Sequence, residues 1–302
     1  MNFMKILITG AGGLIGTELQ KLYGGEGHEL LIATRSEAKK PEQIQWSNED
    51  GFRSEDIARI EGLDAVIHLA GESISGLRWT DEKKQAIRES RVKTTRNLVD
   101  ALFELKERPK VLVSMSGIDF YGDTGDEIKT ETDKAGGTFL AEVCKAWEAE
   151  ARRAEDAGIR TVILRTAMVL SAKGGALATM LTPFKLGVGG VVGSGKQWMS
   201  WIALDDIVNI IRFAVENEGL RGAINATSPN PVTNEEFTAA MGEVLYRPTF
   251  LPLPEFAVNL AMGEMGHTLL LDSRRAIPKR LTDAGFEFKY PDIKAALEHA
   301  TK

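Results

Sequence analysis

The chain has 302 residues, of which 43% are hydrophobic and 26% charged, so it is long and apolar enough for one large domain or two modest ones and wholesale disorder is excluded. Its 37 basic and 43 acidic side chains give a net charge of −6, which argues against nucleic acid or an anionic membrane surface as the main partner. The single cysteine, Cys144, excludes an internal disulfide and a thiolate metal cluster. The 4 histidines lie far apart, without metal-ligand spacing, so we expect no metal.

The opening apolar run is too short for a signal peptide, and no later run approaches the ~20 apolar residues that a membrane span needs. We therefore expect a soluble, cytoplasmic protein whose partner is a small molecule.

Short apolar runs predict buried strands, and helical patterns lie between them. The predicted strands are 5–9, 29–34, 64–70, 110–114 and 161–165, and the predicted helices are 13–23, 81–105 and 140–157. Strands that alternate with helices are typical of a doubly wound parallel α/β sheet, the Rossmann fold.

The pattern changes after residue 166, where glycines crowd the segment 167–203. An amphipathic helix is expected at 204–216, and we expect the segment 204–226 to return to the sheet. From residue 227 the pattern is mostly helical. We therefore predict an NADP(H)-binding Rossmann core of residues 1–166, and a smaller, mostly helical substrate part formed by 167–203 and 227–302.

The first predicted strand ends in Thr-Gly-Ala-Gly-Gly-Leu-Ile-Gly, in which Gly10, Gly13 and Gly16 are spaced as G-x-x-G-x-x-G. Gly10 permits a tight turn, Gly13 lets a pyrophosphate approach the backbone, and Gly16 lets the helix pack on the strand. Leu14 and Ile15 open that helix, whose free N–H groups would face the phosphates. The alternative is a tight strand–helix turn that binds nothing.

The end of the second strand predicts which dinucleotide binds. A carboxylate there would favour NAD, but the strand runs into Thr34 and Arg35 with no acidic residue. A guanidinium can pair with a 2′-phosphate in a bidentate manner, which favours NADP(H). The alternative is a solvated surface arginine.

A second glycine-rich segment, 190–196, matches G-x-x-x-x-G-K. Gln197 follows it, so the hydroxyl that would hold Mg²⁺ is missing, and no long strand precedes it. We do not interpret this segment as a P-loop.

The chain resembles the extended, sugar-epimerase-like type of the short-chain dehydrogenase/reductase superfamily. The matching pieces are the glycine turn, the run Asp64-Ala-Val-Ile-His-Leu-Ala-Gly71, the run Val111-Leu-Val-Ser-Met-Ser116 leading to Tyr121, and Arg165 at a strand end.

Further runs resemble the atypical "epimerase family protein" subgroup. They are Arg78-Trp-Thr80, Phe139-Leu-Ala-Glu-Val-Cys144, Gly193 to Trp201, Asn225 to Asn234, and Lys289-Tyr-Pro291, which resembles a small terminal domain. The resemblance spans nearly the whole chain and implies NADP(H) binding with Leu69, Ala70, Gly71 and Arg165 beside the cofactor.

In the superfamily a tyrosine passes a proton and a lysine four residues later lowers the pKa of that tyrosine. Here the element is missing. With Glu148 at the usual downstream glutamate position, Leu140 and Cys144 stand at the two positions, and a shift of one residue in either direction does not restore both the tyrosine and the lysine. Leu140, Val143, Cys144 and Trp147 also have the spacing of a buried helical stripe. Cys144 is therefore either a thiol in the active site or a small apolar filler.

Arg91 stands where extended members carry an asparagine, so the resemblance places a guanidinium near the cofactor. It could hold a ribose or phosphate and offset the missing lysine. The alternative is a surface arginine on a charged helix.

Ser116 is the expected upstream serine, with Ser114 as the alternative because the alignment needs one inserted residue. Tyr121 lies just after a core strand, where ligands collect, and it either donates a proton or forms a pocket wall. The histidine usual further downstream is replaced by Ala203. The candidate catalytic residues are therefore Ser116, Tyr121 and Cys144.

Two hypotheses follow. The first is an NADP(H)-dependent oxidoreductase or epimerase-like enzyme that acts on a small or sugar-like carbonyl substrate. The second is an NADP(H)-binding sensor or scaffold without hydride chemistry, because the Tyr–Lys pair is missing. The resemblance also leaves a homodimer through two helices as an open alternative.

Overall fold

The structure is a computed structural model that describes residues 3–47 and 51–302. Within these residues, eight strands form one sheet in the order β11-β7-β6-β5-β1-β2-β3-β4. All neighbours pair in parallel except β3 and β4. The strands are β1 Lys5–Thr9, β2 Glu29–Thr34, β3 Gln43–Ser47, β4 Gly51–Phe52, β5 Ala65–His68, β6 Val111–Gly117, β7 Arg160–Thr166 and β11 Gly222–Ala226.

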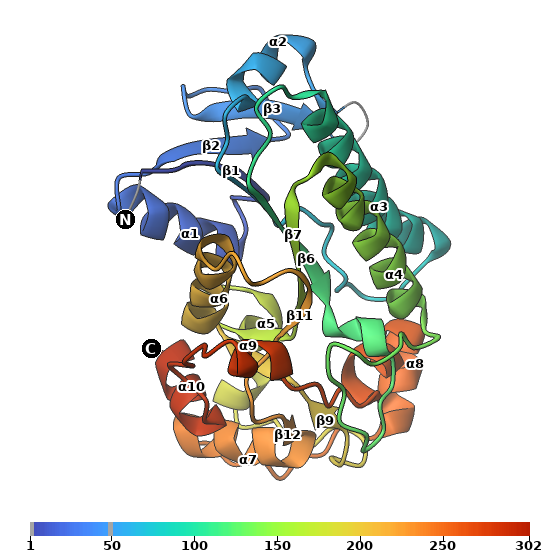
Figure 1. Ribbon diagram of the computed structural model, residues 1–302. Helices are drawn as coiled ribbons and strands as arrows, with labels where there is room; N and C mark the ends of the chain where they lie inside the picture. Colours follow the sequence, from blue (N-terminus) through green and yellow to red (C-terminus); the bar gives the residue numbers. More distant parts are fainter. Residues whose placement is uncertain (1–2, 48–50) are drawn as a thin grey trace.

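Helices cover both faces of this sheet (Figure 1). The helices α1 (Leu14–Gly25) and α6 (Leu204–Glu216) pack their apolar side chains on one face. The helices α3 (Asp81–Glu104) and α4 (Phe139–Arg152) lie on the other. This arrangement confirms the predicted doubly wound Rossmann sheet.

Several boundaries differ from the prediction. The helix expected at 140–157 ends as an α-helix at Arg152, and a tight 3-10 turn, Arg153–Ala157, completes it before Gly158 adopts a φ of +78°. The strands β3 and β4 and the short helix α2 (Ser54–Ile57) were not predicted. The strand β3 is short and alternates partly buried with buried residues, so it lacks the continuous apolar run of the central strands.

The smaller part contains short strands and helices around its own apolar core (Figure 1). Its elements are β8 Met168–Leu170, α5 Gly175–Lys185, β9 Trp198–Met199, β10 Trp201–Ala203, β12 Val232–Thr233, α7 Asn234–Leu245, α8 Glu255–Gly266, a π-helical turn His267–Leu271, α9 Lys279–Asp283 and α10 Ile293–Ala300. Trp201, Phe237 and Leu297 lie at the centre of this core and are fully or almost fully buried. This smaller part is mostly helical, as predicted.

The strand order indicates where a ligand would bind. From β1 the chain proceeds to β2 and β3 on one side, and from β5 to β6 and β7 on the other. The connections therefore diverge between β1 and β5, and ligands of open α/β sheets bind outside the carboxyl ends of strands at such a switch point.

Candidate functional site: the carboxyl edge of the sheet

The glycine turn after β1 is packed so closely that two of its glycines admit no side chain. Gly10 has a φ of +67°, and a Cβ on it would lie 2.8 Å from the amide nitrogen of Ala70. A Cβ on Gly16 would lie 2.6 Å from the Cα of Ala11. The turn is therefore locked between α1 and the end of β5.

The N-terminus of α1 leaves its backbone donors open. Gly13 is the N-cap, and within the described residues it has no side-chain capping bond and no acidic residue follows in the first turn. A Cβ on Gly12 would meet no described atom within 4 Å. Leu14 and Ile15 pack against the core and hold the helix in place. The open N–H groups and the helix dipole form a site suited to an anion.

A buried histidine links the ends of β1 and β5. His68 Nδ1 lies 2.7 Å from Thr9 Oγ1, and its Nε2 lies 2.9 Å from Thr95 Oγ1 of α3. The backbone N–H of Ala70 also donates to Thr9 Oγ1. Burial lowers the pKa of His68 to about 3, so the ring is neutral at pH 7. These bonds fix the path of Leu69, which follows β5.

The end of β2 carries Thr34 and Arg35 on the surface beside this edge. The Thr34 hydroxyl lies 3.4 Å from that of Ser36. Lys83 is the main cause of the lowered pKa of Glu72, and the positive charges of Arg35 and Arg91 lower it further. The two guanidinium groups therefore lie near the loop that follows β5.

Arg91 lies on α3 at the opposite side of that loop. Its guanidinium carbon lies 3.4 Å from the position of a Cβ on Gly71 and 5.3 Å from the ring centre of Trp147. Its Nη1 donates to the carbonyl of Ile87 and to Ser90 Oγ. Burial lowers the pKa of Arg91, and no ion pair to it is found among the described residues.

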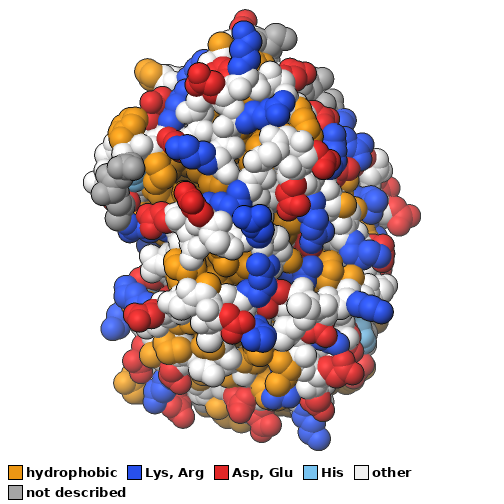
Figure 2. Space-filling view, in the orientation of Figure 1, with side chains coloured by type: hydrophobic (Ala, Val, Ile, Leu, Met, Phe, Trp, Pro, Cys, Tyr) orange, Lys and Arg blue, Asp and Glu red, His pale blue; other side chains and the backbone are white. Residues whose placement is uncertain are grey.

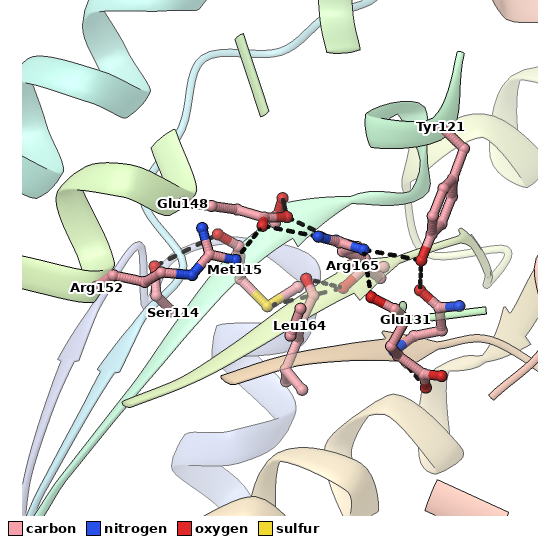
Figure 3. A network of polar contacts seen from close by, with 12 residues as sticks. Ser114, Met115, Tyr121, Glu131, Glu148, Arg152, Leu164 and Arg165 are labelled. Atoms are coloured by element: carbon pink, nitrogen blue, oxygen red, sulfur yellow. Dashed lines mark hydrogen bonds and ion pairs between the residues drawn. The ribbon is translucent and has the colours of Figure 1, made fainter. Parts of the chain in front are cut away.

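Arg165 is directed toward Glu148 and Tyr121 in the interior of the protein (Figure 3). Its Nε and Nη2 donate to the two carboxylate oxygens of Glu148, at 2.8 and 3.0 Å. Both side chains are almost completely buried, at 3% and 0% exposure. The ring of Phe120 lies 3.4 Å below the guanidinium carbon. We expected Arg165 beside the cofactor, but the structure engages it in a buried ion pair because its side chain leaves β7 on the α4 face.

The same ion pair binds Ser116, whose hydroxyl donates to Glu148 Oε1 at 3.0 Å. Arg152 adds a bond to Glu148 Oε2 from its partly exposed side. Ser114 lies deeper on β6, is fully buried, and contacts a backbone carbonyl. Of the two serine alternatives, Ser116 is the one nearer the carboxyl end of the strand, and the network uses its hydroxyl.

Tyr121 is also held by this network (Figure 3). Its hydroxyl lies 2.8 Å from the carbonyl of Thr130 and 2.7 Å from Asn225 Oδ1, and it accepts a bond from Arg165 Nη1 at 2.9 Å. Burial is the main cause that raises its pKa to about 12. The phenol therefore remains protonated and is surrounded by protein partners.

Cys144 lies on the buried face of α4, and the predicted stripe with Leu140, Val143 and Trp147 is confirmed. Burial is the main cause that raises the pKa of the thiol to about 12, and the charge of Asp119 contributes. Cys144 is therefore a protonated thiol at neutral pH. Leu140 packs with apolar neighbours at the position of the missing tyrosine.

Acidic and basic side chains are interspersed over the face shown in Figure 2. No group of three or more His, Cys, Asp or Glu residues that could hold a metal ion occurs in the part of the chain that is described. In the same residues, no helix has both the length and the apolar character to cross a membrane.

Comparisons with known proteins agree with this geometry. Residues 6–226 match the model of the NAD dependent epimerase/dehydratase family. The chain belongs to that family. Residues 253–300 of this family member match a second model, a domain of unknown function named DUF1731. The resemblance to the epimerase family proteins is thereby confirmed.

Relatives that match this chain over nearly its whole length are named epimerase family proteins. It is 40% identical to the epimerase family protein Mb2239 of Mycobacterium bovis, over 98% of this chain and 97% of the relative. It is 38% identical to epimerase family protein YfhF of Bacillus subtilis, over 97% of each chain.

Solved structures extend the comparison. The crystal structure of human epimerase family protein SDR39U1 with NADPH has a TM-score of 0.89 and 32% identity, and the match covers 98% of this chain and 99% of the human one. A UDP-glucose 4-epimerase of Thermus thermophilus in complex with NAD has a TM-score of 0.76 at 18% identity, with 99% and 98% covered, and shows the common fold.

One contact that this family member makes at the site was not predicted. Asp119 lies two residues after the end of β6, and its Oδ1 accepts a bond from Arg274 Nε at 2.9 Å. Its Oδ2 lies 3.3 Å from the position of a Cβ on Gly117. The two parts of the chain are thus joined next to Cys144. The partners are 155 residues apart, so no local pattern signals their contact.

Proposed function

We propose that this protein binds NADP(H) at the carboxyl edge of β1, β2 and β5, and that it acts as an oxidoreductase or epimerase-like enzyme on a small or sugar-like carbonyl substrate. The observation that carries the proposal is the uncapped N-terminus of α1 above the locked glycine turn, at the switch point of the sheet. That the related human protein was crystallised with NADPH supports it.

The residues of this edge fit a dinucleotide. The turn with Gly10, Gly13 and Gly16 and the first residues of α1, Leu14 and Ile15, would hold the pyrophosphate. On one side, Leu69, Ala70 and Gly71 would line the ribose and nicotinamide half. On the other, Thr34 and Arg35 would hold the 2′-phosphate, because no carboxylate stands at the end of β2 to favour NAD.

When bound, the nicotinamide supplies a hydride acceptor or donor. The chain itself must place the carbonyl and move a proton. Ser116 and Tyr121 hold the end of β6 through Glu148 and Arg165, so we assign them a positioning role for that strand end. Cys144 carries a proton at neutral pH and lies beside Gly117, so its thiol would be the proton donor once bound cofactor and substrate open the buried side chain to the carbonyl.

A second function is favoured by one observation. The hydroxyls of Ser116 and Tyr121 are bound within the protein, and the Cys144 thiol is buried. A protein that binds NADP(H) as a sensor or scaffold needs none of these groups for chemistry. In that case saturating NADPH would change the protease sensitivity of the helical C-terminal part, and no carbonyl compound would be reduced.

The first experiment titrates the protein with NADPH and with NADH and follows the quenching of its 5 tryptophans. We expect tighter binding of NADPH, and we expect an Arg35→Asp variant to lose that preference. Arg88→Ala, an exposed arginine on α3, is the control and should bind as the wild type does. A wild-type preference for NADH would refute the role of Arg35.

The second experiment separates the two functions. A broad panel of carbonyl compounds is incubated with the protein and NADPH, and stereospecific oxidation of the cofactor is measured. An enzyme shows turnover above buffer with some member of the panel. Cofactor binding without any turnover, combined with altered proteolysis, favours the sensor instead.

A further inference from the structure

Arg91 has an electrostatic environment unlike that of Arg165, a buried arginine at the same end of the sheet. Arg165 is buried against a carboxylate that binds it through two bonds. Arg91 is partly buried, donates one nitrogen to a carbonyl and a hydroxyl, and has no ion pair within the described residues. A guanidinium withdrawn from water without a carboxylate in direct contact is unfavourable, so an anionic partner at contact distance would stabilise it beyond what the more distant charges of Asp119 and Glu72 provide.

The position of Arg91 specifies where that partner lies. Gly10 packs closely on Ala70, just after β5, and a Cβ on Gly71, the next residue, would lie 3.4 Å from the guanidinium carbon of Arg91. The open N-terminus of α1 and the Arg91 guanidinium therefore flank the same short backbone segment. An anion on the glycine turn would lie near both groups.

The sheet order specifies which half of the dinucleotide is involved. Arg35 follows β2, on one side of β1, whereas Gly71 follows β5 on the other side, and Arg91 of α3 lies near Gly71. Arg91 also interacts electrostatically with Asp119, two residues after the end of β6, and with Glu72 in the loop after β5. Arg91 is thus on the side of the cofactor away from the 2′-phosphate.

We propose that Arg91 binds the phosphate group next to the nicotinamide ribose, while Arg35 binds the 2′-phosphate at the adenosine end. This inference rests on the proposed function and adds a division of labour between the two arginines. Arg91 is then a binding residue for one phosphate, and the helix N-terminus shares that phosphate with it.

Three probes test the division. NADPH contains both phosphates of the bridge and the nicotinamide, 2′-phospho-ADP-ribose lacks only the nicotinamide, and adenosine 2′,5′-bisphosphate lacks the second bridge phosphate and everything beyond it. Dissociation constants are measured by calorimetry for wild type, Arg91→Met, Arg91→Lys, Arg35→Ala and the control Arg88→Ala, and the melting temperature of each variant is recorded.

We expect Arg91→Met to weaken NADPH and 2′-phospho-ADP-ribose roughly 10- to 100-fold, the effect typical of a lost charge-assisted bond, and to leave the bisphosphate within twofold. Arg91→Lys keeps the charge and should recover part of the loss even if Arg91→Met folds poorly. Arg35→Ala should weaken all three probes. Arg88→Ala should change none.

Two outcomes would overturn the assignment of Arg91. In one, the Arg91 variants bind all three probes as the wild type does. In the other, they lose all three equally, which is the result of a purely structural role. If the wild-type protein binds no probe at all, the proposed function itself fails, and this result is distinct from both.

Discussion

The cofactor edge and the buried network lie at the carboxyl ends of strands in one sheet, yet their polar groups are in opposite states. At the edge, the N-terminal amides of α1 and the Arg91 guanidinium keep open donors. In the network, Ser116 and Arg165 bind Glu148, and Arg165 also binds Tyr121. Open donors indicate a ligand site, whereas satisfied buried groups indicate a structural centre.

The largest expected effect is on the rate at which the Cys144 thiol is alkylated. With a pKa of about 12, about one thiol in 10⁴ is ionised at pH 8, and the thiolate is the reactive form. We expect iodoacetamide to label the native protein at least ~10³-fold more slowly than the protein in urea, measured by mass spectrometry. A Cys144→Ser variant gives the background. Equal labelling rates would show that the thiol is open to the site.

The next largest expected effect is on the free energy of unfolding, when the buried ion pair between Arg165 and Glu148 is broken. Arg165→Met should lower the free energy of unfolding by about 3–5 kcal/mol, because it leaves the Glu148 carboxylate buried without its main partner. Urea denaturation measures the change. The control Arg152→Met removes a half-exposed partner of the same carboxylate and should cost about 1 kcal/mol or less.

Adding Glu148→Leu to Arg165→Met should recover part of the loss, because the unpaired charge is then removed. A loss below 1 kcal/mol in Arg165→Met alone would contradict the description of this network as a structural centre.

The histidine below the cofactor edge predicts a pH dependence. Its pKa is about 3 in the fold and near 6.5 when unfolded, so between these values only the unfolded chain binds the proton. The stabilisation from neutral His68 is complete above pH 6.5 and is lost as the pH falls toward 3. Between pH 6.5 and 5 the loss is about 2 kcal/mol.

Urea denaturation at pH 7, 6 and 5 measures this loss. A His68→Gln variant keeps hydrogen-bonding capacity toward Thr9 and Thr95 but cannot titrate, so its stability should change less over the same range. Identical pH profiles for the two proteins would mean that His68 is not the titrating group.

The smallest expected effect sharpens the contrast between the two regions. Tyr121→Phe removes one hydroxyl from the network and should cost about 1–2 kcal/mol of stability. It should leave the dissociation constant of NADPH within twofold, as measured by tryptophan quenching, because Tyr121 is not among the proposed cofactor contacts. A tenfold weaker affinity would place Tyr121 at the cofactor edge.

The two regions also differ in how far the sequence predicts them. The cofactor edge is built from contiguous residues after β1 and β5, so the spacing of Gly10, Gly13 and Gly16 predicts a turn that the structure contains. The network joins Tyr121 to Asn225, 104 residues away. Such partners are brought together by the sheet register and leave no local pattern.

Arg165 shows most clearly where the sequence does not predict the contacts of a side chain. Its place at a strand end favoured a cofactor contact, but neighbouring residues of a strand face opposite sides of the sheet. In the structure Leu164 packs in the core with α1 and α6, whereas Arg165 faces Glu148 of α4. Adjacent residues at the end of a strand can therefore have different partners, and the strand prediction alone does not show whether such a side chain contacts a ligand or an ion-pair partner.

We propose above all that the carboxyl edge of β1, β2 and β5 binds a nicotinamide dinucleotide that carries a 2′-phosphate. Equilibrium dialysis of the wild-type protein against NADPH and NADH, at equal ionic strength, measures this directly. We expect the protein to retain NADPH at near one molecule per chain and to retain NADH more weakly. A folded protein that retains neither dinucleotide would contradict it.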